Sequence, residues 1–174
     1  NPTGGDFDLG TPNENFGGPG IGAGGMVSND TPLGNLLVIG ENLDDGNSDG
    51  LVDDPDDTDA HGVLFEFDFS TLTRNKKGAV TVNSVTVVDI EREQGEDGAF
   101  IEMSGNDIPT ALIGIPSTGN NGVHTIDGIA LEGVQMMRIT LNGSGAVDTI
   151  VFDDDQPGTC WITTGGFHNS GIQS

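Results

Sequence analysis

Negative charge is the feature that most constrains how this chain can fold. The 174 residues include 28 Asp and Glu against 5 Lys and Arg, which gives a formal net charge of −23. Eight of the acids lie between Asp44 and Asp59, and no basic residue precedes Arg74. A bare run of like charges repels itself and stays unfolded. A bound multivalent cation is the simplest remedy, so the charge by itself points to a metal-binding protein.

The same charge excludes several classes of partner. Nucleic-acid binding needs clustered Lys and Arg, and an anionic membrane surface would repel this chain. No apolar run approaches the roughly 20 residues of a membrane-spanning helix, so we expect no direct membrane insertion. With a single cysteine, Cys160, the chain is not a disulfide scaffold.

The apolar residues are numerous enough for a folded core. Val, Leu, Ile and Phe make up about a quarter of the chain, above the roughly 20% below which disorder is expected. They occur in short runs separated by turn-forming residues, and no stretch keeps a helical period. We expect strands at residues 36–39, 63–69, 79–91, 99–103, 111–115, 124–130, 136–141 and 146–152. This pattern predicts an all-β protein, an antiparallel β-sandwich with jelly-roll topology and long Gly/Asp-rich loops.

Several finer expectations accompany this fold. Residues 63–69 alternate strictly, so their Val and Phe side chains should face one side of a sheet. A bulge or turn is expected at residues 83–84. The sequence Asn-Gly-Ser-Gly at 142–145 stands between two alternating runs, which predicts a hairpin. We expect the sandwich domain to span residues 1–155, followed by an irregular tail at 156–174 that docks elsewhere or begins a following segment.

The spacing of oxygen ligands after residue 44 is the sharpest functional signal. From Asp45 the sequence has the form D-x-N-x-D-G-x-x-D-x-x-D. Positions 1, 3, 5, 9 and 12 of a calcium loop would be Asp45, Asn47, Asp49, Asp53 and Asp56, with the backbone carbonyl of Leu51 at position 7. Ca²⁺ takes roughly six to eight oxygen ligands at about 2.4 Å, and Gly50 at position 6 allows the sharp turn. The sequence therefore predicts a Ca²⁺ site in residues 45–56, which we call the acidic loop.

Two departures separate the acidic loop from an EF-hand. Asp56 stands where the usual residue is Glu, and its shorter side chain would favour a weaker, monodentate last ligand. The flanking residues 36–39 and 63–69 are predicted strands, whereas an EF-hand has helices at these places. The alternative interpretation is a solvated acidic loop that holds no metal.

Three further acidic clusters are weaker candidates for a second ion. The first offers Asp6, Asp8 and Asn13 together with Glu14, the second Asp89 and Glu91, and the third Asp153 with Asp154 and Asp155. Each stands where a loop meets a predicted strand end or lies in a turn-rich segment. For each of them a surface turn without a metal is the alternative.

Other constellations predict no catalytic centre. Residues 20–25 match G-x-G-x-x-G, but a dinucleotide site needs a strand before this motif and a helix after it. His61, His124 and His168 are far apart and lack ligand spacing. Pairs of carboxylates, as glycosidases use, are uninformative among 28 acids. We predict a protein without enzymatic activity, with a glycosidase or lyase as the enzyme alternative.

Taken in order, several motifs resemble modules of large secreted or cell-surface bacterial proteins. They are GGDFDLGTPNENFGGPGIGAGG at 4–25, TPLGNLLVIGEN at 31–42, PDD at 55–57, the Phe-rich strand, SVTVVDIERE at 84–93 and GSGAVDTIVFD at 143–153. The acidic loop resembles the calcium loops of thrombospondin type-3 repeats and dockerins. The resemblance implies an extracellular or cell-surface β-sandwich and carries over no catalytic residues. Such modules have a strand or two upstream of the GGD motif, so we expect this chain to lack one of their strands and to be a piece of a longer protein.

These observations predict a non-catalytic, calcium-stabilised extracellular module with a structural or adhesive role in a surface layer, matrix or fibre. The expected partners are other copies of this chain or neighbouring domains, with glycans as a further class. In an oligomer or fibre the tail would pack on the next subunit through Trp161, Ile162, Phe167 and Ile172. The alternative function is a calcium-dependent carbohydrate-binding module of a secreted enzyme. With one Trp and no Tyr, an aromatic platform for sugars is not evident.

Overall fold

The computed structural model describes residues 12, 29–40, 46–48, 63–72, 78–90, 98–119 and 121–154, and the backbone of 160–163 and 166–169. The strands are β1 (Leu37–Val38), β2 (Val63–Asp68), β3 (Val80–Val88), β4 (Phe100–Gly105), β5 (Ile108–Gly114), β6 (Val123–Ile126), β7 (Leu131–Val134), β8 (Met136–Leu141), β9 (Ala146–Asp153), β10 (Cys160–Thr163) and β11 (Gly166–Asn169). A 3₁₀ turn at Phe69–Thr71 follows β2. No helix among the described residues is long and apolar enough to cross a membrane.

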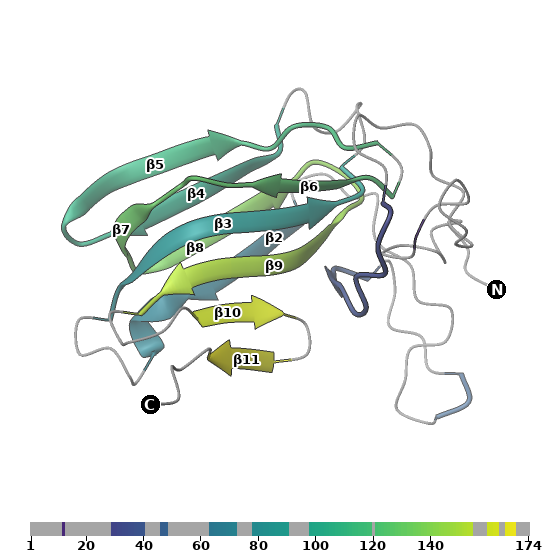
Figure 1. Cartoon of the computed structure of the whole chain (residues 1–174), viewed down its shortest axis with the longest axis horizontal. Coiled ribbons are helices and arrows are strands. Elements are labelled where there is room, and N and C mark those ends of the chain that lie inside the picture. The colour runs from purple at the N-terminus through teal and green to yellow at the C-terminus, as the bar shows by residue number, and fades with distance from the viewer. Residues whose placement is uncertain are drawn as a thin grey trace.

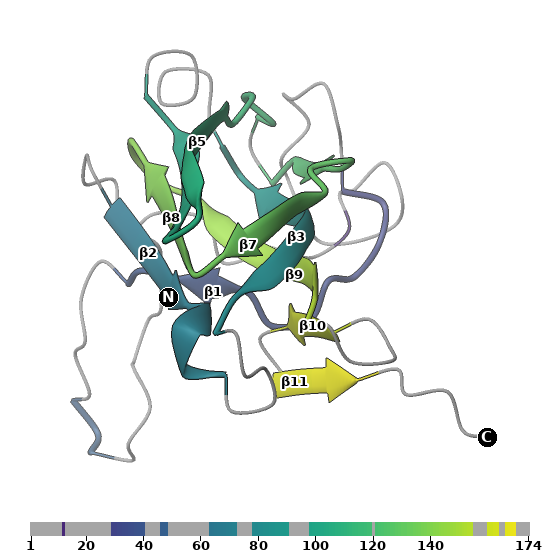
Figure 2. The same cartoon turned by 90° about the vertical axis from the view of Figure 1, so that its left-hand side faces the viewer.

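The strands form two antiparallel sheets that pack face to face (Figure 1). Within the described residues the larger sheet has seven strands in the order β11–β10–β9–β3–β6, with β1 also paired to β9 and β7 to β3. The smaller sheet has four strands in the order β2–β8–β4–β5. β5 and β11 lie at opposite margins of the sandwich (Figure 2). The predicted all-β antiparallel sandwich is confirmed, and its jelly-roll topology stays a prediction.

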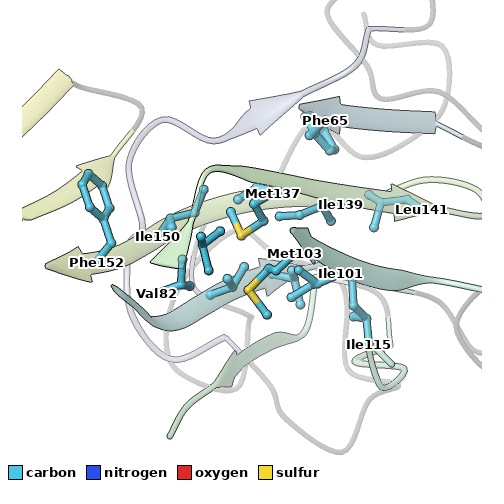
Figure 3. Packing of buried hydrophobic residues seen from close by; sticks show 14 of the residues in the cluster. Phe65, Val82, Ile101, Met103, Ile115, Met137, Ile139, Leu141, Ile150 and Phe152 are labelled. Atoms are coloured by element: carbon cyan, nitrogen blue, oxygen red, sulfur yellow. The ribbon is translucent and has the colours of Figure 1, made fainter. Parts of the chain in front are cut away.

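Alternation along the strands builds the core between the sheets. In β8, Met137 and Ile139 are fully buried and Leu141 is nearly so, because every second side chain of a strand points to the same face. Val82 and Val85 of β3 meet them from the larger sheet, and the whole cluster is one contiguous core (Figure 3). Burial of each such side chain contributes about 1.5–3 kcal/mol, which is the main favourable term in a chain whose charges repel.

The strand β2 confirms the alternation expected for residues 63–69. Phe65 and Phe67 stand opposite Ile139 and Met137 of β8, while Leu64 lies on the outer face. Asp68 ends the strand, since its carboxylate accepts a hydrogen bond from the backbone N–H of Ser70 at 2.9 Å. The 3₁₀ turn that follows carries the Phe69 side chain into the core, where it is 2% exposed.

The bulge expected at residues 83–84 is confirmed. Val82 pairs with Phe152 and Ser84 with Val151, so the register between β3 and β9 shifts at Asn83. The shift keeps Val82 and Val85 on the core face although they are three residues apart. Without it, one half of the strand would present its apolar side chains to solvent.

The hairpin expected at residues 142–145 is wrong. β8 belongs to the four-stranded sheet and β9 to the seven-stranded sheet, so the chain crosses between the sheets instead of turning back within one. Ser144 is 5% exposed, and Gly145 has a φ of +139° and lies against Ile90, whose Cδ1 would be 2.8 Å from an added Cβ. Alternation of apolar residues shows which side of a strand is buried. The alternation is the same whether the next strand pairs with it in one sheet or lies across the core in the other sheet, so it could not exclude a crossover here.

Three strands were not expected from the sequence. The run predicted at 124–130 ends at Ile126, and the chain continues along the same edge of β3 as β7, with the backbone N–H of Ile129 bonded to Asn83 O at 3.1 Å between them. After residue 155, where an irregular tail was expected, β10 pairs with β9 and β11 pairs with β10. The tail thus contributes a hairpin to the margin of the larger sheet.

Candidate functional site

The acidic loop lies in the connection between the two sheets. β1, which precedes it, pairs with β9 in the seven-stranded sheet, and β2, which follows it, pairs with β8 in the four-stranded sheet. The nearest described elements on either side are strands, as the sequence predicted, whereas an EF-hand loop is flanked by helices. An ion held here would tie together a crossover that carries most of the chain's concentrated charge.

Of the predicted loop ligands, Asn47 falls among the described residues. It lies in an exposed turn with Gly46, and Ser48 beside it has a left-handed φ of 60°. The remaining predicted ligands of the loop lie outside the described residues: Asp45, Asp49, Leu51, Asp53 and Asp56. Six of the further candidates also lie outside them: Asp6, Asp8, Asn13, Glu14, Glu91 and Asp155. Their roles in calcium binding stay predictions.

Asp89 is a buried acid at the place where three segments meet. It is 1% exposed and has a left-handed φ of 63°, a conformation that Asp and Asn tolerate better than most residues. Its Oδ1 accepts a hydrogen bond from the backbone N–H of Asn121, and its Oδ2 accepts one from the Ser144 hydroxyl at 3.4 Å. Its own N–H donates to Gly122 O at 2.9 Å. The carboxylate therefore ties the end of β3 to the β5–β6 loop and to the crossover between β8 and β9.

Ile90 continues this junction through its backbone. Its N–H donates to the Thr118 hydroxyl at 2.7 Å, and its carbonyl accepts from the backbone N–H groups of Thr118 and Gly119 at 2.6 and 3.1 Å. Its side chain packs in the core. We call the hydrogen-bonded group of Asp89, Ile90, Thr118, Asn121 and Ser144 the Asp89 junction. Buried polar groups must be paired, and here the pairing joins loops from both sheets.

The structure separates the candidate metal ligands of β3 and β9. Asp153 is opposite Thr81 at the start of β3, whereas Asp89 follows the end of that strand. Eight residues of strand correspond to about 25 Å, so these two acids cannot share an ion. Asp153 accepts a hydrogen bond from Asn83 Nδ2 at 2.9 Å, and Asp154 next to it is buried. In the described part of the chain, no group of three or more His, Cys, Asp or Glu side chains is placed to hold a metal.

One cation offsets part of the negative charge on the outer face of the four-stranded sheet. Arg138 of β8 donates to Glu66 of β2 at 2.8 Å and to Glu102 of β4 at 3.3 Å, so it bridges its two neighbouring strands. These hydrogen bonds, that to Glu66 first, raise the pKa of Arg138 above its ordinary value. The arginine thus stays charged at any physiological pH. Because the pair is well exposed, it contributes little to stability, and its main effect is to cancel charge in the middle of this sheet.

A shallow groove of about 290 Å³ lies beside the edge strand β6. Its lining comes from the segment before β1 and from β6: Asn29, Asp30, Thr31, Leu33, Val123, His124 and Thr125. Asn29 is buried and its side-chain oxygen accepts a hydrogen bond from Thr31 N at 2.9 Å. Thr125 shares a hydroxyl–hydroxyl contact of 2.9 Å with Thr86. The groove offers hydroxyl, carboxylate and imidazole groups, with Leu33 and Val123 as its apolar part.

Sequence reasoning singled out Asp89 but missed the groups that it binds. Asn121 and Ser144 are 32 and 55 residues away along the chain, and nothing in the local pattern links them. The comparisons with protein-family models, with curated proteins and with solved structures find no match for this chain. Function therefore has to be argued from the chain's own residues.

Proposed function

We propose that this protein is a non-catalytic, calcium-stabilised module with a structural or adhesive role outside the cell or at its surface. The observation that carries the proposal is the ligand spacing of the acidic loop, in which five oxygen-bearing side chains and Gly50 follow the order of a calcium loop. The net charge of −23 adds a physical need for a divalent cation.

The fold supports this role in a specific way. The loop connects β1 of one sheet to β2 of the other, so an ion that orders the loop also restrains the two sheets relative to each other. Ions that bind only the native state stabilise it by RT ln(1 + [L]/Kd), about 2.7 kcal/mol at a hundredfold excess over Kd. A stable bead of this kind suits a surface layer, a matrix or a fibre, where the partners are further copies or neighbouring domains.

The first prediction concerns calcium and thermal stability. We expect the melting temperature in Ca²⁺ to exceed that in EDTA by several degrees at matched ionic strength, because the ion binds only the folded loop. Asp49→Ala should remove most of this difference, since it deletes the ligand at position 5.

Asp127→Ala is the matched control for that variant. Asp127 is an exposed acid after β6, so its removal makes the same change in net charge without touching the acidic loop, and the calcium effect should survive. A melting temperature that is equal in Ca²⁺ and EDTA would rule out the site. An equal loss in both variants would show that calcium acts only by screening charge.

The groove beside β6 favours a second function, carbohydrate binding. Thr31, His124 and Thr125 present hydrogen-bonding groups next to an apolar surface, which is the chemistry of a sugar's hydroxyls and ring face. Binding on a glycan array that Thr125→Val abolishes would favour this function. Loss of that binding in EDTA would mean that calcium takes part in it.

A further inference from the structure

The strand β5 is an edge strand that carries no charge. It pairs with β4 along one side, and no other described strand pairs with it. Figure 1 shows it at the margin of the four-stranded sheet. In a chain with 28 acids, residues 108–123 contain no Asp, Glu, Lys or Arg. Proteins usually protect such edges with charged side chains or cover them, so an uncharged edge that no other described strand covers calls for an explanation.

The hydrogen-bond pattern shows which backbone groups of β5 face the open side. The N–H of Ile115 donates to Ala99 O at 3.0 Å, next to the opposed pair Phe100 and Gly114. Residues of an antiparallel pair bond alternately toward the partner and away from it. Ile113 and Ala111 therefore bond to β4, whereas Leu112 and Gly114 direct their N–H and C=O groups away from it. These groups form a template for another strand.

The side chains of β5 also suit a partner strand. Leu112 is 66% exposed, the highest value among the exposed large apolar side chains of the described residues. It stands opposite Glu102, whose charge is partly offset by Arg138, which Glu102 shares with Glu66. A Cβ on Gly114 would meet nothing within 4 Å, so the face of the sheet is open at this position beside Leu112.

The other edge of the same sheet is protected. β2 carries Glu66 and Asp68 on the outer face, and it exposes Leu64 to a smaller extent, 46%. Two copies that met along β2 would bring four carboxylates together. They would repel each other, because Arg138 can offset only part of that charge. Charge distribution thus distinguishes the two edges and singles out β5 for contact with an equally acidic molecule.

We propose that β5 pairs antiparallel with β5 of a second copy, about a two-fold axis at Leu112. In this register Leu112 stands opposite the partner's Leu112, so the outward-facing N–H and C=O groups of the two leucines pair across the axis. Gly114 stands opposite the partner's Thr110, next to the place where the register between β4 and β5 shifts. Two four-stranded sheets then join into one. The contact is isologous and closes on itself, which gives a dimer. The inference deepens the proposed structural role and rests on it, but it does not depend on calcium.

Sedimentation equilibrium of the full chain tests the dimer. We expect the average mass to rise toward twice that of a single chain as the protein concentration increases from about 10 μM to about 1 mM, a range suited to a small interface. Association should strengthen between 0.15 and about 0.5 M NaCl, because salt screens repulsion between two acidic molecules. A mass that stays that of a single chain throughout would overturn the proposal, and growth beyond a dimer would overturn the two-fold geometry.

Two glutamate variants locate the contact. Leu112→Glu places like charges directly opposite each other, and we expect dimer affinity to fall at least tenfold. Leu64→Glu makes the same change in charge on the opposite edge of the sheet, and the dimer should persist. Far-ultraviolet circular dichroism checks that both variants keep their strands. An equal loss of dimer affinity in both variants would mean general charge repulsion. A loss with Leu64→Glu alone would place the contact on β2. Either result overturns the proposal, and so does a dimer that neither variant weakens.

The same measurements in Ca²⁺ and in EDTA separate this proposal from the calcium function. If a dimer forms and the melting temperature does not depend on calcium, the β5 contact is supported and the calcium site is excluded. If the melting temperature depends on calcium and no dimer forms, the calcium site is supported and the β5 contact is excluded. Cross-linking at position 112 identifies the strand that binds to β5. A complex without a Leu112–Leu112 cross-link would mean that a strand of another protein, or the tail of another copy, binds there, and it would overturn the two-fold pairing.

Discussion

At the scale of single residues, Asp89 shows how one acid can serve structure in a chain dominated by acids. Its left-handed backbone ends β3, and its two carboxylate oxygens accept hydrogen bonds from two loops that lie far apart in the sequence. The carboxylate thus replaces backbone pairing at the end of the sandwich, where the strands no longer reach each other. Its described partners are protein donors, and a role for Asp89 in metal binding stays a prediction.

The second prediction follows from this arrangement. Asp89→Ala should lower the free energy of unfolding by about 2–4 kcal/mol, because buried donors lose their acceptor at about 1–3 kcal/mol each and Ala resists a positive φ. Asp89→Asn keeps an acceptor for Asn121 N–H and tolerates the backbone, so it should cost about 1 kcal/mol. Urea unfolding of the two variants and of the control Asp127→Ala measures these differences. If Asp89→Ala is as stable as the control, the junction does not hold the end of the sandwich.

At the scale of strands, the two sheets are fixed to each other where β7 meets β4. Gly105 lies so close to the Gly133 carbonyl oxygen that an added Cβ would clash with it. The N–H of Gln135 donates to Ser104 O at 2.9 Å in the same place, and the N–H of Phe69 donates to Gln135 O at 2.8 Å. The short segment between β7 and β8 therefore carries the chain from one sheet into the other without leaving its backbone groups unpaired.

The third prediction tests this close approach with two glycines from neighbouring strands. Gly105→Ala forces a methyl group against a backbone oxygen that cannot move aside, so we expect a loss of about 3 kcal/mol or more. Gly114→Ala, on β5, adds a methyl group to open space and should leave stability unchanged or slightly improved. Thermal unfolding of both variants makes the comparison. Equal stability of the two would mean that β4 and β7 separate readily.

At the scale of the whole molecule, charge sets the conditions under which the chain folds. A net charge of −23 destabilises any compact state through self-repulsion. The core between the sheets supplies the opposing term, and calcium in the acidic loop would remove two charges where they are most concentrated. The uncharged strip of β5 then becomes the surface on which two such molecules can meet.

The fourth prediction concerns acid. Carboxylates that bind Ca²⁺ have pKa values lowered from the ordinary value near 4, and a lowered pKa gives stability that is present above the unfolded value and lost as pH falls through the folded one. The difference in melting temperature between protein with Ca²⁺ and protein freed of Ca²⁺ at pH 7 should therefore be full near pH 7 and vanish below about pH 4. The calcium-free series corrects for the effect of acid on the remaining carboxylates, and it contains no EDTA because a protonated chelator no longer binds Ca²⁺. A difference that persists unchanged below pH 4 would argue against carboxylate ligands.

The sequence by itself determined most of the segments that form strands and which side of them is buried, but not β7, β10 and β11. Alternation at residues 63–69 and the break at residues 83–84 both appear in the structure, because the period of a strand and the need to keep Val82 and Val85 on one face are local properties. The strands on either side of the acidic loop were predictable for the same reason, since the residues of β1 and β2 show a strand pattern by themselves.

Only the tertiary structure decided which strands pair and which groups meet. The connection at 142–145 crosses between sheets. β10 forms because the edge of β9 is open to it, and β11 pairs in turn with β10. Asp89 acquires its role from Asn121 and Ser144, which reach it from other loops. Pairing and burial of this kind depend on contacts between residues that are distant in the chain. A local pattern shows the alternation of a strand, but it does not show which other strand will be its neighbour.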